Sequence, residues 1–314
     1  MQPVILAAPP GISPKTAERY CQLADQQIYR HLGKIPLQKL TSAHIQKWHT
    51  TLLASGGKKG RPLHPRTVGH AHRVLHTALA RAARGQLVAR NVASIEKPPR
   101  VDDREVASLT AHQITDVLDK LLDHPLHPIV VVALGTGLRR GEILALQWGN
   151  VEFDAAKLRV ERSIEGTKFS LRFKPPKSKH GKRSVALPPS VIDVLREHRR
   201  RQLETRLALG LGKFSDDDLV FSRADGSPMP PNKLSRDWAN LVISRKLPRG
   251  PFHGLRHTHV SALIAGGLDV FSVSRRIGHN SPALTLKVYS HLFTEKASVA
   301  IEAIEAVLRT GVER

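Results

Sequence analysis

The stretch GHNSPALTLKVYSHLF, residues 278–293, predicts a helix that carries one of only three tyrosines in the chain, Tyr289. Ser281 followed by Pro282 is typical of a helix start, because serine is a good N-terminal cap and proline fits the first helical position. The apolar residues that follow suit an amphipathic helix. Two interpretations of Tyr289 stay open at this point. It is either a half-buried phenol that fills space or a chemical group that works with His279, earlier in the same stretch.

Similar signals predict that most of the chain is helical. Many of the predicted helices begin at a polar N-cap residue and end at a glycine. Residues 127–137 are apolar on most faces, which indicates a buried helix. Looser alternation of apolar and polar residues predicts three short strands, at residues 158–164, 169–174 and 183–188, with a hairpin-like loop between the last two. The other predicted helices are residues 15–32, 42–54, 66–83, 111–124, 138–148, 190–209, 236–246, 252–265, 270–277, 282–290 and 295–309.

The segment EKPPRVDDRE, residues 96–105, separates two predicted domains. Two prolines and mixed charges without periodicity are typical of a linker. We therefore expect a loose lead-in at residues 1–12, a helical bundle at 13–96, a linker at 97–105 and an α+β domain at 106–314. The predicted fold class is mainly α with a small antiparallel β-sheet.

The chain is strongly basic. It has 49 lysines and arginines against 27 aspartates and glutamates, which gives a formal net charge of +22. The positive residues run from Lys15 to Arg314 and do not gather in one tail, so the basicity belongs to the folded surface. Such a balance points to a polyanionic partner such as DNA, the alternative being a basic protein without one.

Several classes of site lack support. The single cysteine, Cys21, excludes an internal disulfide and fits a reducing compartment. We find no signal peptide pattern, no apolar run long enough to span a membrane, and no ATP-binding glycine loop. The acidic residues form no two-metal set. His72 and His76 are one helical turn apart, but without a further ligand nearby we expect a solvated or DNA-facing side rather than a metal site.

TGLRRGEILAL, residues 136–146, places Arg139 at the start of a predicted helix, just after a glycine. The N–H groups of a helix N-terminus and a guanidinium fork both suit a phosphate. The alternative is a surface arginine that pairs with Glu142, three residues further on.

Two further basic patterns could bind an anion. The loop KPPKSKHGKRSV, residues 174–185, presents several basic side chains between two predicted strands, the alternative being a solvated turn. HGLRH, residues 253–257, puts His253 and Arg256 on one face of a helix. That spacing alone is weak, because it arises by chance in a chain with 17 histidines.

Taken in order, TGLRRGE, the lysine loop, HGLRHTH and IGHNSPALTLKVYSH resemble the motifs of the tyrosine recombinases, and specifically the phage-type integrases. Several motifs in a fixed order make a far more specific match than any one of them. The resemblance covers roughly residues 11–310. It implies that the helical bundle is a core-type DNA-binding domain and that the α+β domain is catalytic.

The resemblance assigns roles to three cations. Arg139 and Arg256 would bind the non-bridging oxygens of the scissile phosphate and stabilise its transition state. Lys179 best matches the loop lysine that protonates the leaving 5′ oxygen, although Lys177 and Lys182 remain alternatives.

It also assigns roles to two histidines and the tyrosine. His253 would hold the phosphate and assist proton transfer, and His279 would donate another hydrogen bond to it. Tyr289 would be the nucleophile that forms a 3′-phosphotyrosine link. A phenol with an ordinary pKa near 10 needs positive charge beside it for this task. The link conserves the phosphodiester energy, so no cofactor, metal or ATP is expected.

The function implied is site-specific recombination that integrates or excises phage or mobile-element DNA. A homo-tetramer on two DNA duplexes is implied, with the helix at residues 295–309 packed on a neighbouring protomer, the alternative being packing on its own protomer. Directionality factors or host DNA-bending proteins are further possible partners, and the bacterial cytoplasm, at the nucleoid, is the expected location. The alternatives are Xer-like dimer resolution, a non-catalytic DNA-binding regulator and a metal-dependent nuclease.

Overall fold

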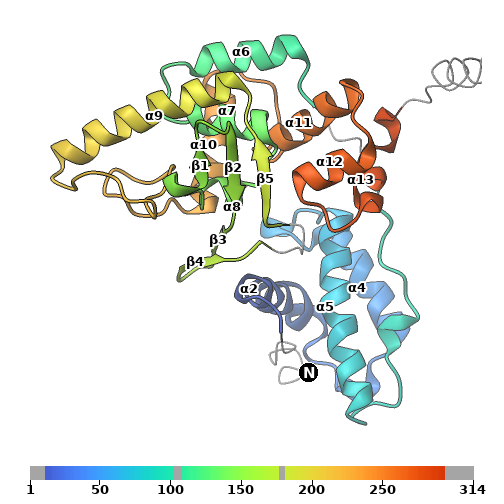
Figure 1. Ribbon diagram of the computed structural model, residues 1–314. Helices are drawn as coiled ribbons and strands as arrows, with labels where there is room; N and C mark the ends of the chain where they lie inside the picture. The colour runs from blue at the N-terminus through green and yellow to red at the C-terminus, as the bar shows by residue number, and fades with distance from the viewer. Residues whose placement is uncertain (1–10, 102–107, 177–180, 294–314) are drawn as a thin grey trace, which may run out of the picture. The chain divides into compact units, whose positions relative to one another are not determined.

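The computed structural model describes residues 11–101, 108–176 and 181–293. The chain divides into two compact units, Met1–Arg104 and Glu105–Arg314. Helices dominate both units, and the described strands lie in the second (Figure 1). The predicted fold class, mainly α with little antiparallel sheet, is confirmed. In the described part of the chain, no helix is both long and apolar enough to cross a membrane.

The first unit is a helical bundle. The predicted helix of residues 15–32 is continuous but contains a π-helical stretch, and Thr41 caps the next helix through reciprocal hydrogen bonds with His44. The elements are α2 (Pro14–Leu23), η1 (Ala24–Tyr29), α3 (Arg30–Leu32), η2 (Leu37–Lys39), α4 (Ser42–Ser55), η3 (Lys58–Gly60), α5 (Pro65–Arg84) and η4 (Val92–Ser94).

Two histidines lie inside the core of this unit. His72 on α5 and His49 on α4 are both buried, and Nδ1 of His72 lies 3.1 Å from Nε2 of His49. Burial, together with the neighbouring His49 and His76, lowers the pKa of His72 to about 4. The expectation of a solvated or DNA-facing position is therefore wrong for His72, because the core-facing side of α5 includes this residue.

The second unit is built around α7, which is buried on most sides as its apolar sequence predicts. Helix α7 packs against α6, α9 and α11 (Figure 1). The helices of this unit are α6 (Ala111–Leu121), α7 (His127–Thr136), α8 (Arg140–Ile143), α9 (Pro189–Ala208), α10 (Pro231–Ser244), α11 (Gly254–Ala265), α12 (Val270–Ile277) and α13 (Pro282–Tyr289), with 3₁₀ turns η5 (Trp148–Asn150) and η6 (Ser290–Leu292).

Helix α8 is much shorter than the predicted helix of residues 138–148. After Ile143 the chain leaves the helix, because its backbone pairs with a distant segment instead. The carbonyl of Leu146 accepts from the N–H of Val220, and the N–H of Trp148 donates to the carbonyl of Asp218. Tertiary pairing thus replaces the last helical turns.

The strands form two small antiparallel sheets. One has the order β1-β2-β5 and the other pairs β3 with β4. In the first, Leu158 is opposite Val185, and both are buried. The bounds are β1 (Val151–Glu152), β2 (Lys157–Val160), β3 (Ser163–Gly166), β4 (Leu171–Lys174) and β5 (Arg183–Ala186).

This topology corrects two predictions. The predicted strand of residues 158–164 is two strands in different sheets, because β2 pairs with β5 whereas β3 pairs with β4. For the same reason the basic loop between β4 and β5 is no hairpin, since its flanking strands are not neighbours.

Candidate functional site

Five of the six predicted site residues come from separate turns and helix ends of the second unit. Two of those turns are made by glycines in the left-handed region, Gly137 with φ 63° and Gly278 with φ 66°. Residues with a Cβ rarely adopt this conformation. Around these turns and the adjoining helix ends stand Arg139 before α8, His253 and Arg256 at the start of α11, His279 after α12, and Tyr289 at the end of α13.

Arg256 connects three of these segments. Its side chain is buried, and it donates to the carbonyl oxygen of Gly137 at 2.5 Å and to that of Ile277 at 2.7 Å. Both carbonyls lie at helix C-termini, where the helix dipole favours a cation. Burial, with a smaller contribution from the charge of Arg139, lowers the pKa of Arg256 to about 9. Because its partners are neutral carbonyls, its positive charge can still act on an anion.

Arg139 is held at the same place by a buried carboxylate. Its Nη1 donates to Glu142 at 2.8 Å, and its Nη2 donates to the carbonyl of Gly278 at 2.8 Å. Glu142 also accepts from Arg183 at 2.9 Å. Burial alone would raise the pKa of Glu142, but the two guanidinium groups outweigh burial and lower it. The pairing of Arg139 with Glu142, considered above as an alternative to a functional role, is therefore present inside the site.

His253 and His279 are neutral imidazoles in this cationic surrounding. Burial is the main cause that lowers the pKa of each to about 4, and the charges of Arg256 and Arg139 add to it. Nδ1 of His279 lies 2.9 Å from the hydroxyl of Thr285, which is buried on α13. A neutral imidazole can donate a hydrogen bond to phosphate without adding charge.

Tyr289 is 3% exposed, and its phenol contacts a histidine that sequence reasoning had not assigned. The phenol oxygen lies 2.5 Å from Nδ1 of His257. Burial raises the pKa of Tyr289 to about 12, and the charge of Arg256 opposes that shift. The phenol is therefore protonated at neutral pH and must lose its proton if it is to attack.

Lys179, the sixth predicted site residue, lies outside the described residues, as does Lys177. Of the loop lysines, Lys182 is described. It is largely exposed and forms an ion pair with Glu161 at 3.3 Å.

Arg183 and His257 are the two members of the cluster whose positions the sequence did not reveal. Arg183 lies within the basic loop of residues 174–185 described above, yet its side chain is almost fully buried, and its Nε donates to the carbonyl of Arg276 at 2.8 Å. The sequence did carry a signal for this burial. Arg183 and buried Val185 are two residues apart on β5, so both side chains point to the same, inward side of the strand. For His257 the signal was its place one helical turn after His253.

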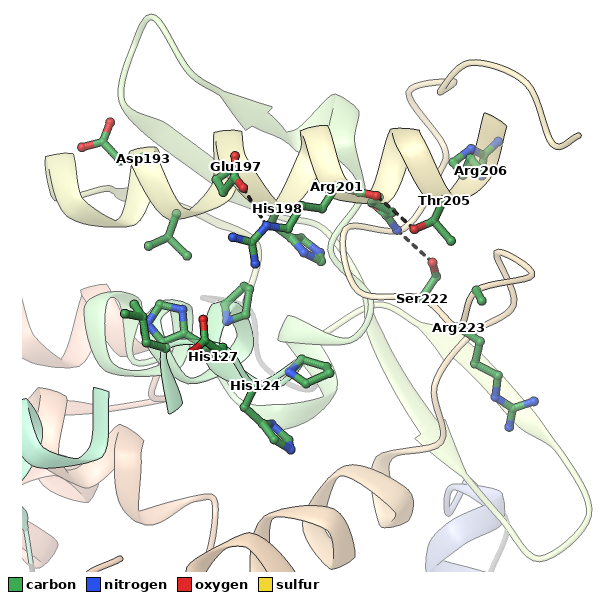
Figure 2. Close-up of a pocket in the computed structure, with 17 residues that line it drawn as sticks. His124, His127, Asp193, Glu197, His198, Arg201, Thr205, Arg206, Ser222 and Arg223 are labelled. Carbon is green, nitrogen blue, oxygen red and sulfur yellow. Dashed lines mark hydrogen bonds and ion pairs between the residues drawn. The ribbon is translucent and has the colours of Figure 1, made fainter. Parts of the chain in front are cut away.

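A groove of about 810 Å³ lies elsewhere on the second unit. Figure 2 shows His124 and His127 beneath α9, which carries Glu197 and Arg201. Glu197 accepts hydrogen bonds from two arginines of α9, so its charge is already compensated. The residues that line this groove are all different from those around Tyr289.

The cluster around Tyr289 has the composition of a phosphodiester site. Three arginines face one carboxylate, so the site carries excess positive charge that an anion can neutralise. A nucleophilic oxygen stands beside this charge. In the described residues, His, Cys, Asp and Glu form no group of three or more that could hold a metal ion.

Comparison with known proteins gives matches over both units of the chain. Residues 100–296 match the model of the phage integrase family, and residues 8–53 match the phage integrase N-terminal SAM-like domain. A tyrosine recombinase XerC-like protein of Caldanaerobacter subterraneus subsp. tengcongensis is 27% identical, over 84% of this chain and 71% of that protein. An integrase of Streptomyces ambofaciens is 28% identical, over 97% of this chain and 78% of its own length.

The fold is also that of solved integrases. The Tn1549 transposon integrase, in complex with transposon right end DNA, superposes with a TM-score of 0.77 and 19% identity, over 94% of this chain and 95% of that chain. The family model spans more than half of the present chain, including Arg139, Arg256 and Tyr289. The chain therefore belongs to the phage integrase family and is a tyrosine-type site-specific DNA recombinase.

Proposed function

We propose that Tyr289 is the nucleophile of this recombinase and becomes joined to the 3′ phosphate of the DNA strand that it cleaves. Arg139 and Arg256 bind the non-bridging oxygens of that phosphate. Their guanidinium groups are held in place before the substrate arrives, so little reorganisation is needed as charge develops in the transition state. The observation that carries this proposal is the buried phenol standing in the field of Arg256.

The remaining roles follow from the same chemistry. His253 and His279 donate hydrogen bonds to the phosphate as neutral imidazoles, which their lowered pKa values support. Lys179 protonates the 5′ oxygen as it leaves. Residues 13–96 form the core-type DNA-binding domain, and residues 106–314 form the catalytic domain.

Strand exchange between two duplexes involves four half-sites, so we assign one protomer to each in a homo-tetramer. The helix expected at residues 295–309, for which the resemblance implies a role between protomers, lies outside the described residues. The reaction integrates or excises phage or mobile-element DNA in the bacterial cytoplasm, at the nucleoid, and directionality or DNA-bending factors assist it. Xer-like dimer resolution is the alternative within the same chemistry.

The covalent link to DNA tests this function. A DNA half-site nicked just beyond the scissile phosphate loses its short leaving strand, so cleavage becomes irreversible and the protein–DNA adduct accumulates. We expect an adduct with the wild-type chain, none with Tyr289→Phe, and about 10²- to 10³-fold slower formation with Arg139→Ala. An equal yield of adduct from Tyr289→Phe would refute the assignment of the nucleophile.

Chelation distinguishes this reaction from metal-dependent cleavage. We expect EDTA to leave the rate of adduct formation unchanged, since arginines supply the charge on the phosphate. Loss of cleavage with EDTA, together with products that carry no protein, would favour the nuclease alternative.

A further inference from the structure

The nucleophile proposed above must lose a proton, and few groups are placed to take it. Among the described residues, the only hydrogen-bond partner of the Tyr289 phenol is Nδ1 of His257, at 2.5 Å. His253 immediately precedes α11, with its ring centroid 5.0 Å from that of His257, but it makes no such bond to the phenol. Glu142, the carboxylate of the site, is engaged by two arginines.

Building on the proposed function, we propose that His257 is the general base that takes the phenol proton of Tyr289 as the phenol oxygen attacks DNA. The proposal also implies one tautomer of His257. The phenol is protonated and donates, so Nδ1 of His257 accepts and its proton resides on Nε2. His257 is thus a catalytic residue distinct from His253, to which we assign a hydrogen bond with the phosphate.

The step balances in both directions. As the Tyr289 oxygen bonds to phosphorus, its proton passes to His257 Nδ1, the bond between phosphorus and the 5′ oxygen breaks, and that oxygen leaves with a proton from the loop lysine. In the rejoining step, a 5′ hydroxyl attacks the phosphotyrosine and gives its proton back to the lysine. The tyrosine oxygen then leaves and recovers its proton from His257.

The surroundings of His257 keep it neutral and ready to accept a proton. The groups that face it are Arg256 on α11, His253 just before that helix, and Tyr289 on α13. His279, beside the α12–α13 turn, also interacts electrostatically with it. Burial first, and then the charge of Arg256, lower the pKa of His257 below its ordinary value of 6.5. The imidazole is therefore unprotonated at neutral pH.

His257→Asn tests the proposal, because the asparagine amide oxygen can accept the phenol hydrogen bond but cannot take the proton. With the nicked half-site in single-turnover conditions, we expect adduct formation to slow by about 10²- to 10⁴-fold with unchanged DNA affinity. His291→Asn, an exposed histidine in η6, is the matched control and should cleave at the wild-type rate.

The pH profile separates a base from a structural residue. The wild-type rate should be flat at neutral pH and should fall only as the pH drops through the lowered pKa of His257, where the imidazole becomes protonated. In His257→Asn the rate should instead rise tenfold per pH unit through the neutral range, because the phenolate must form without help. A fluorinated tyrosine of lower pKa at position 289 should restore much of the lost rate in this variant.

A wild-type rate for His257→Asn, or a slow rate with the wild-type pH profile and no rescue by the fluorinated tyrosine, would overturn the proposal for His257. A failure of the proposed function itself is distinguishable, since the wild-type chain would then form no adduct, or Tyr289→Phe would form one.

Discussion

The carboxylate of Glu142 neutralises and positions the arginines of the site, and loss of its charge should destabilise the second unit. Its carboxylate is 2% exposed and accepts hydrogen bonds from Arg139 and Arg183, whose side chains are 38% and 7% exposed. Taking one partner from a buried ion pair costs about 3 to 5 kcal/mol. Arg139 is partly screened by solvent, and glutamine keeps one acceptor oxygen. For Glu142→Gln we therefore expect a loss of about 2 to 4 kcal/mol in the free energy of unfolding.

Hydrogen exchange followed by mass spectrometry measures this loss locally. Peptides from α7 and α11, which pack together in the second unit, report its opening free energy separately from that of the first unit. Glu197→Gln is the matched control. Glu197 also accepts from two arginines, but it is exposed, so solvent screens the charge and we expect protection to remain at the wild-type level.

The pH dependence has a definite sign. The pKa of Glu142 is lowered in the folded protein, so its stabilisation is present above the ordinary carboxyl pKa of 4.5 and is lost as pH falls through the lowered value. The stability difference between the variant and the wild-type chain should be constant above pH 4.5 and should shrink as the pH falls through the lowered pKa of Glu142. Equal stability of the two at neutral pH, or a difference that does not change in acid, would refute this account of the site.

The other predictions concern the turn at Gly137, the buried His72 of the first unit and the N-cap residue of α6, Thr110. Gly137→Ala should unfold at lower temperature and cleave DNA more slowly, because φ is 63° there and a Cβ would lie 2.5 Å from Cδ2 of His259; unchanged melting in calorimetry would contradict this. The pKa of His72 is lowered to about 4, so the first unit should lose stability as pH falls below 6.5, by on the order of 3 kcal/mol at pH 4. His72→Gln should flatten that slope in circular dichroism melts, and an equally steep slope would exclude His72 as its source. Thr110→Ala removes the N-cap of α6 and should cost about 1 kcal/mol in urea unfolding, with no change in cleavage; a larger cost would show that Thr110 does more than cap.

The helices were largely predictable from the sequence because their signals are local. Capping threonines, prolines at the first turn and terminal glycines act within a few residues, so the starts of α4 and α6 and the end of α12 could be located without knowledge of the fold. The order of the motifs around Arg139, Arg256 and Tyr289 was equally visible, as was the excess of positive charge, because neither depends on which residues meet in space.

The tertiary structure decided the features that depend on contacts between residues far apart in the sequence. Helix α8 ends early because the backbone near Leu146 pairs with residues around Val220, and the strand of residues 158–164 divides because its halves find different neighbours. The contact between His257 and Tyr289 joins residues 32 positions apart, and no local pattern encodes it. Local propensity therefore determined the elements and the candidate groups of this protein. Burial and long-range hydrogen bonds decided which of those groups stand within reach of the nucleophile and which are charged.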